Sequence, residues 1–222
     1  MEITIPEIVG KAGRELTDGL LEFTETVIDS SAAELIFDEI PVVKIITGLY
    51  KAELSIREGL FARKLEDFFK AASRSSGPTR QEREQAIKNF GGEENRQRVG
   101  ETMILLLDRT EDMQMPKLLG YIMMWLMMGR FVYSDAMTLA AVVDRIIYED
   151  IRLLVRACPS IDVTGGTDFS AVHHLQASGL MYQSVLNAGS YDDDDEATQQ
   201  FSPTTTGEQL ADVFRDMCSK DG

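Results

Sequence analysis

The run from Leu118 to Gly129 constrains the fold more than any other stretch of this sequence. It is almost entirely apolar and uncharged, and it contains Trp125, the single Trp of the chain, and four of the eleven Met residues. Apolar surface left in water costs roughly 25 cal/mol per Å², so the protein itself, a partner or lipid must cover the run. We expect a Met-rich core helix at about residues 116–131 that other helices surround, with Trp125 largely buried by its own chain.

Two alternatives for this run stay open. The first is insertion into a membrane, which the length of the run disfavours because a spanning helix needs roughly 20 apolar residues. The second is a Met-lined groove for the helices of a partner, because Met side chains adapt to irregular surfaces. The core helix remains the preferred interpretation.

Apolar residues at spacings of three and four predict a helical bundle over residues 1–158. Its longest helix is expected at about 41–73 and would extend ~50 Å at 1.5 Å per residue. The charged residues of that helix, Lys64 and Glu66 among them, are interpreted as a solvated face. A linker rich in Ser and Gly follows at 73–78. Further helices are expected from Pro6 to Val27, from Ser31, from Thr79 to Phe90, from Glu93 to about Thr110, and from Ser134 or Asp135 to about Cys158.

The pattern changes at Pro159, and residues 159–222 predict a small α+β module. The whole fold is therefore expected to be mainly α, a helical bundle with this module attached. In chain order we expect a loop at Ile161–Thr167, a helix at Phe169–Ser178 that Gly179 ends, strands at Leu180–Leu186 and Ala197–Phe201, and a last helix whose capping box is Thr205-Thr206-Gly207-Glu208.

This succession resembles the end of a winged-helix domain. In that family a helix leads into a Gly-Leu strand, here Gly179-Leu180, a hairpin wing follows, and a T-x-x-G segment begins the closing helix. The resemblance covers about 50 residues. It implies a winged-helix-like module, and DNA contact through the helix at Phe169–Ser178 and the wing is frequent in the family.

The charges of this module depart from a DNA-binding use. No Lys or Arg occurs from Ala157 through Phe214, whereas nine acidic residues occur there. DNA-binding proteins place several cations against phosphates. We therefore interpret the module as a protein-contact or structural element. Its partner-contact candidates lie at the expected hairpin tip: Tyr191, Asp192, Asp193, Asp194, Asp195 and Glu196.

A second resemblance concerns residues 40–69. The segments Ile40-Pro41-Val42-Val43 and Leu54 to Phe69 are similar to the opening of a group of uncharacterised bacterial and phage helical proteins. The resemblance covers about 35 residues and implies a bacterial or phage origin without an activity.

No pattern in the chain indicates catalysis, a cofactor or a metal. His173 and His174 are adjacent, so on a helix they point about 100° apart and do not address one metal or nucleophile. Five consecutive acids at 192–196 lack the alternating ligands and central Gly of a calcium loop. Cys158 and Cys218 form no disulfide framework and are expected to be thiols in the cytoplasm. We expect a protein that is not an enzyme and has no cofactor.

The net charge of −15 repels phosphate backbones and anionic lipids. Together with the acidic module, it favours a non-enzymatic interaction or assembly protein: an oligomer subunit, adaptor or inhibitor. Its expected partner is a protein with a basic surface, a second copy of the chain, or both. The alternatives are a membrane-active effector that inserts its apolar helices and a winged-helix transcriptional regulator.

Overall fold

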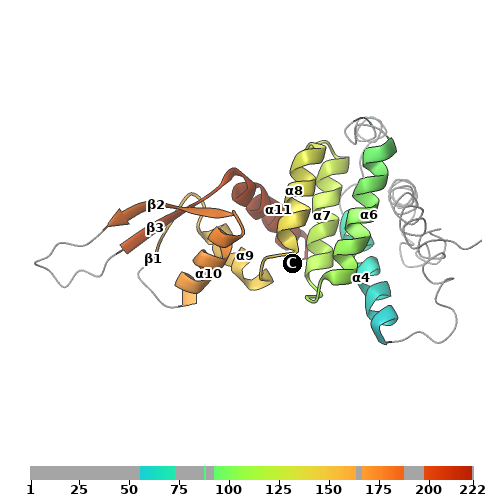
Figure 1. The fold of residues 1–222 in the computed structure, drawn as a ribbon, viewed down its shortest axis with the longest axis horizontal. Coiled ribbons are helices and arrows are strands. Elements are labelled where there is room, and N and C mark those ends of the chain that lie inside the picture. Colours follow the sequence, from blue (N-terminus) through green and yellow to red (C-terminus); the bar gives the residue numbers. More distant parts are fainter. Residues whose placement is uncertain (1–55, 74–87, 89–92, 164–166, 188–197, 222) are drawn as a thin grey trace, which may run out of the picture. The chain divides into compact units, whose positions relative to one another are not determined.

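The computed structural model describes residues 56–73, 88, 93–163, 167–187 and 198–221 (Figure 1). Within this part the protein is mainly α, as the sequence predicts, with seven helices and one three-stranded antiparallel sheet. Several predicted segments lie outside the described residues: the helices at 6–27 and from Ser31, the helix at 79–90 apart from Lys88, the first part of the long helix, and the linker after Ser73.

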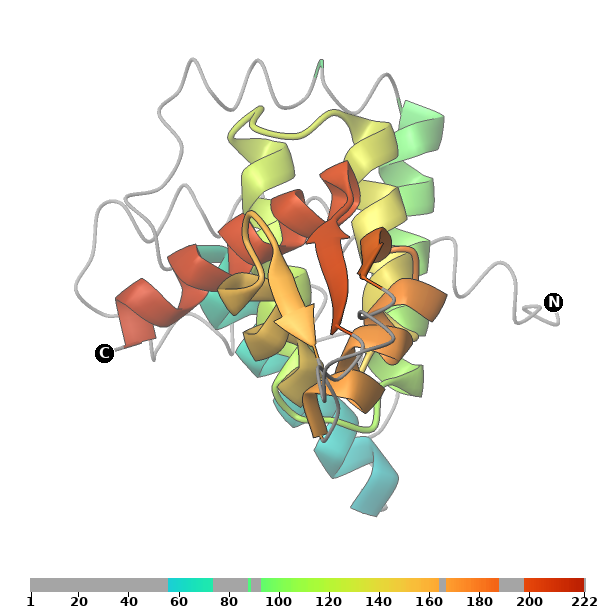
Figure 2. The same ribbon diagram turned by 90° about the vertical axis from the view of Figure 1, so that its left-hand side faces the viewer.

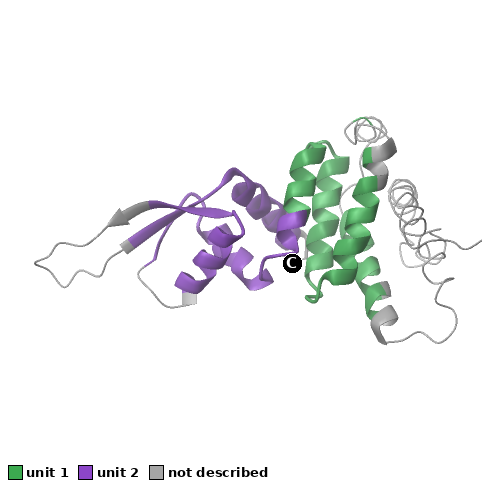
Figure 3. Cartoon of the chain, in the orientation of Figure 1, with its two compact units in different colours: residues 1–140 green, residues 141–222 purple. Residues whose placement is uncertain are grey.

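The chain divides into two compact units, residues 1–140 and 141–222 (Figure 3). The division falls within α8 (Tyr133–Val143), before the change of sequence pattern at Pro159. The difference arises because α9 (Tyr148–Arg156), which the sequence assigns to the bundle, packs against two helices of the second unit, α10 (Thr167–Ala177) and α11 (Thr205–Asp221).

In the first unit, α4 (Ile56–Ser73) packs along α7 (Met115–Met127), and α6 (Glu93–Arg109) lies against α4. Phe68 and Phe69 on α4 are fully buried. The two helices approach closely at Gly120, where an added Cβ would lie 2.4 Å from the carbonyl oxygen of Phe68. A side chain at this position would force α4 and α7 apart.

The helix α7 is the predicted core helix. Every residue from Met115 to Met127 is buried except Lys117 and Trp125. Trp125 is partly exposed, and its ring packs against that of Phe131, with 5.1 Å between the centroids. The helix begins at Met115, with the predicted Pro116 in its first turn. It ends at Met127 rather than near 131, because Gly129 adopts a left-handed φ of 71°.

No helix in the described part of the chain is long and apolar enough to cross a bilayer.

Lys64 contradicts the interpretation of the charged α4 residues as a solvated face. Its side chain is buried, and its Nζ donates to the carbonyl oxygens of Leu107, at 3.0 Å, and of Thr110. The ammonium group thereby binds the last carbonyls of α6, where the helix dipole favours a cation.

The helix predicted from Ser134 or Asp135 to Cys158 is interrupted and forms α8 and α9 separately. The break lies at 144–147, and Ile147, extended and half exposed, precedes α9 without a side-chain cap. The apolar spacing in the sequence predicted one continuous helix because Ile146 and Ile147 fall at helix-like intervals. In the structure, however, Ile147 is exposed and is not part of the core.

The second unit contains one sheet with the strand order β1-β3-β2. Its elements after α9 are β1 (Ile161–Val163), α10 (Thr167–Ala177), β2 (Met181–Asn187), β3 (Thr198–Pro203) and α11 (Thr205–Asp221). The loop predicted at Ile161–Thr167 is wrong at its start, because Ile161–Val163 pairs with β3 (Figure 2). Its last residue, Thr167, begins α10, and residues 164–166 lie outside the described residues. Three residues contain too little pattern to indicate a strand before the position of β3 is known.

The core of the second unit lies between its helices and one face of the sheet. Val172 and Leu175 of α10, Phe201 of β3 and Leu210 of α11 are fully buried. The rings of Tyr148 and Phe214 join α9 to α11, with their centroids 5.6 Å apart.

Candidate functional site

Four residues join the base of the β2–β3 hairpin to the helices on either side. Gly179 ends α10 with a left-handed φ of 76°. The hydroxyl of Thr204 donates to the carbonyl oxygen of Gly179 at 2.8 Å, and the backbone N–H of Thr204 donates to that of Leu180 at 2.9 Å. The same hydroxyl accepts the N–H of Gly207 at 3.1 Å. Thr204 therefore holds the two ends of the hairpin together and caps α11.

Gly207 is required by the close approach of α11 to Leu180, the residue before β2. A Cβ added at this position would lie 2.1 Å from the carbonyl oxygen of Leu180, closer than any real contact. The cap of α11 is Thr204, one residue before the predicted capping box at Thr205–Glu208. The Gly-Leu and T-x-x-G residues that the sequence singled out thus contact each other directly. We name Gly179, Leu180, Thr204 and Gly207 the hairpin clasp.

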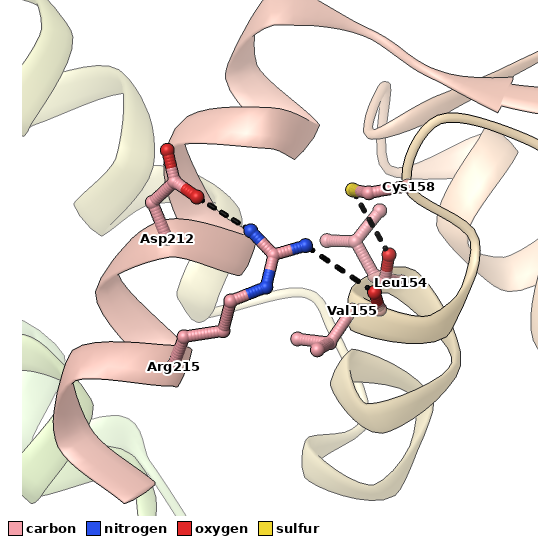
Figure 4. Close-up of polar contacts among 5 residues, drawn as sticks. All are labelled: Leu154, Val155, Cys158, Asp212 and Arg215. Carbon is pink, nitrogen blue, oxygen red and sulfur yellow. Dashed lines mark hydrogen bonds and ion pairs between the residues drawn. The ribbon is translucent and has the colours of Figure 1, made fainter. Parts of the chain in front are cut away.

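A second set of polar contacts fixes α11 against the end of α9 (Figure 4). Arg215 donates from Nη1 to Asp212 and from Nη2 to the carbonyl oxygen of Val155 at 3.3 Å. The Cys158 thiol donates to the carbonyl oxygen of Leu154 at 3.4 Å. These bonds satisfy carbonyls that the last turn of a helix leaves without partners. Cys158 is therefore part of a helix end, whereas Cys218 is exposed on α11.

The adjacent histidines of α10 diverge, as their spacing predicts. His173 packs edge-on against Phe169, with ring centroids 4.4 Å apart, and against Phe201 at 5.7 Å. His174 points to the surface, where its Nδ1 lies 3.1 Å from Asp150 Oδ2. Among the described residues no group of three His, Cys, Asp or Glu side chains is arranged to hold a metal ion.

The outward face of the sheet is polar. Gln200 on β3 donates to Asp162 of β1 at 3.1 Å, and its backbone carbonyl accepts the Ser184 hydroxyl of β2 at 3.1 Å. Tyr182, which pairs with Ser202, is 50% exposed and adds a large aromatic side chain to this face. An irregularity at Ser184 shifts the register between Gln183 and Val185.

In the described part of the chain, β2 forms one edge of the sheet, and its pairing phase determines which of its backbone groups point outward. In an antiparallel pair, the backbone N–H and C=O groups of successive residues point alternately toward the partner strand and away from it. The bond from Thr204 to Leu180 fixes this phase, so Tyr182 faces β3 while the N–H and C=O groups of Met181 and Gln183 point to the free edge. Pro203, which has no N–H to donate, accordingly lies opposite Met181.

The sequence did not indicate this free edge. The phase of a strand depends on one long-range bond, and the order of strands depends on β1, which the pattern missed. The available signal was the composition of Met181–Asn187, which contains no charge and no Pro.

The predicted contact residues Tyr191, Asp192, Asp193, Asp194, Asp195 and Glu196 lie outside the described residues. In the chain they fall between Asn187, the last residue of β2, and Thr198, the first residue of β3. The acids are therefore part of the connection between the two strands, as the sequence predicts, and their contacts remain a prediction.

Comparison with known proteins found no family model, no curated protein and no solved structure that matches this chain.

Proposed function

We propose that this chain is a non-enzymatic interaction or assembly protein whose second unit contacts a basic surface of a partner protein. The observation that supports the proposal is the charge distribution of this unit. Nine acidic residues and no Lys or Arg occur between Ala157 and Phe214. A surface of this kind accelerates encounters with basic partners and repels nucleic acid and anionic lipid.

The cations that flank this segment offset only two of its nine acids, Asp168 and Asp212. Arg152 lies 3.6 Å from Glu149, Arg156 lies 3.3 Å from Asp168, and Arg215 binds Asp212. By contrast, Glu208 is exposed and has no ion-pair partner among the described residues. The second unit therefore has uncompensated negative charge available for a basic partner.

The proposal treats the second unit as a winged-helix-like module used for protein contact. The order of α9, β1, α10, β2, β3 and α11, and the direct contacts within the hairpin clasp, support this interpretation. The helix α10 corresponds to the one that contacts DNA in many members of that family. It contains no Lys or Arg, so it offers no fixed cation to a phosphate.

Affinity capture with a charge-neutralised variant tests the proposal. The variant changes Asp192–Asp195 to Asn and Glu196 to Gln in the full chain. We expect the unmodified chain to retain a protein with a basic surface, less strongly as ionic strength rises toward about 0.5 M. The neutralised variant should retain much less of it.

Two results would contradict this function. One is a chain that is strictly monomeric by light scattering and retains no protein from its native lysate at low salt. The other is retardation of duplex DNA by the chain in a low-salt gel shift, which would favour a transcriptional regulator.

A further inference from the structure

Among the described residues, no strand pairs with the outer edge of β2. The N–H and C=O groups of Met181 and Gln183 point away from β3, and the side chains of Tyr182, Gln183 and Ser184 are exposed. A row of unpaired backbone groups at the surface is a template for an extended peptide, which gains hydrogen bonds by adding to the sheet.

This edge lacks most of the features by which soluble proteins protect exposed strands. Charged residues, Pro and very short length are the usual protections. The seven residues of β2 include no charge and no Pro, whereas β1, the opposite edge, has three residues and exposes Asp162. The irregularity at Ser184 is the one protective feature of β2, and it limits regular pairing to the part of the strand that starts at Met181.

The charges around β2 select the occupant. At its start, exposed Glu208 directly follows Gly207, which contacts Leu180 in the hairpin clasp. After its end, the chain continues from Asn187 to the acids Asp192–Glu196. A second copy of this chain would bring the same acids and a net charge of −15, so electrostatic repulsion disfavours it. A strand that carries Lys or Arg meets opposite charge at the start of β2, where Glu208 is exposed.

We propose that the edge of β2 at Met181–Gln183 binds an extended, basic segment of a partner protein as a fourth strand of the sheet. This inference rests on the proposed function and assigns the contact to the outer backbone edge of β2. Tyr182, half exposed on the outward face, packs against a side chain of the added strand, as cross-strand aromatic pairs do.

A Pro substitution at the edge tests the proposal in the full chain. Gln183→Pro removes an N–H that points outward and leaves the bonds between β2 and β3 intact, because Pro is tolerated at sheet edges. Gln183→Ala is the matched control, since it removes the side chain and keeps the N–H. The probe is a short peptide of alternating Lys and Val residues, compared with one of alternating Glu and Val.

We expect the Lys–Val peptide to bind the unmodified chain and to slow amide hydrogen exchange at Met181–Gln183. Gln183→Pro should weaken binding about tenfold, as the loss of a backbone hydrogen bond and of strand pairing predicts, while Gln183→Ala stays within about twofold. The Glu–Val peptide should not bind. Ser184→Lys adds a cation to the strand without changing the backbone, so it should also weaken binding of the Lys–Val peptide. This variant replaces Gln183→Pro as the test if the Pro variant does not fold.

Unchanged binding of the Lys–Val peptide by folded Gln183→Pro and by Ser184→Lys would overturn the proposal, as would equal binding of the Glu–Val peptide. A dimer of the unmodified chain that Gln183→Pro makes monomeric would assign the edge to a second copy instead. If the charge-neutralised variant loses a partner that Gln183→Pro retains, the proposed function stands and only the role of this edge fails.

Discussion

The uncharged run in α7 and the uncharged strand β2 have opposite environments. The helix satisfies its backbone groups internally, so its apolar side chains alone require cover, and α4 provides much of it through the contact at Gly120. On one side of the strand β2, backbone groups form hydrogen bonds to β3. On the other side, the N–H and C=O groups of Met181 and Gln183 point outward. Absence of charge thus indicates burial in a helix but an unprotected edge in a strand.

Gly120→Val is expected to have the largest effect, because it breaks the cover of α7. A Cβ there meets the Phe68 carbonyl at 2.4 Å and Ala71 Cβ at 2.8 Å, and backbone atoms cannot rotate away. We expect the free energy of unfolding to fall by about 3 kcal/mol or more. Thermal unfolding measures the loss, and hydrogen exchange should increase first in α4 and α7.

The control for this variant is Ala141→Val, an exposed position of α8, which should change the unfolding free energy by about 0.5 kcal/mol. If both variants lose the same stability, the close approach of α4 and α7 at Gly120 is not what determines the packing of the core helix.

Lys64→Met is expected to have the next largest effect. The substitution removes the ammonium that binds the carbonyls of Leu107 and Thr110 at the end of α6, and it leaves these groups in a buried site. We expect a loss of about 2 kcal/mol, the penalty for buried acceptors without a donor. Denaturant unfolding followed by circular dichroism measures it.

Lys70→Met is the matched control on the same helix. Lys70 is exposed and pairs with Glu66 at i,i+4, a contact that contributes about 0.3–0.5 kcal/mol. Comparable losses for the two variants would show that Lys64 stabilises the first unit no more than a surface lysine does.

The elements that the sequence predicted correctly are those whose signal is local. Pro116 and the apolar run indicated α7, and the Gly179-Leu180 and T-x-x-G segments indicated the succession of α10, β2, β3 and α11. Each of these patterns reports a constraint that nearby residues impose, such as a helix start, a left-handed turn or a hairpin.

The features that sequence reasoning missed depend on contacts between distant residues. In the sequence, Lys64 cannot be distinguished from the charged residues of an exposed helix face. Its burial depends on the end of α6, which lies beside it only in the folded chain. The start of α9 at Ile147 has no capping side chain, so nothing local indicates a break there. β1 is a strand because β3 lies beside it, and the outward phase of Gln183 follows from one bond between Thr204 and Leu180.

Thr204→Val should weaken the second unit by a smaller amount and sharpen the contrast with α7. The change keeps the shape of the side chain but removes the hydroxyl that bonds Gly179 and Gly207, so the hairpin clasp loses its cap. We expect a loss of about 1–1.5 kcal/mol, typical of an N-cap. Faster hydrogen exchange in β2 and the first turn of α11 should accompany it.

The control is Thr205→Val, one residue further along α11, where the side chain is exposed. It should lose about 0.5 kcal/mol or less. A clasp variant that unfolds as readily as the control would indicate that β2 is positioned by the sheet alone.

Arg215→Met is expected to have the smallest effect, because its side chain is 44% exposed and its ion pair with Asp212 is solvated. What distinguishes Arg215 from other surface cations is its bond to the Val155 carbonyl, which ties α11 to the end of α9 (Figure 4). We expect a loss of about 0.5–1 kcal/mol. Arg152→Met, which removes only an exposed i,i+3 pair with Glu149, should lose about 0.3 kcal/mol. The difference between the two variants in denaturant unfolding measures the helix-end contact, and a difference of zero would mean that apolar packing such as that of Tyr148 on Phe214 alone holds α11 to α9.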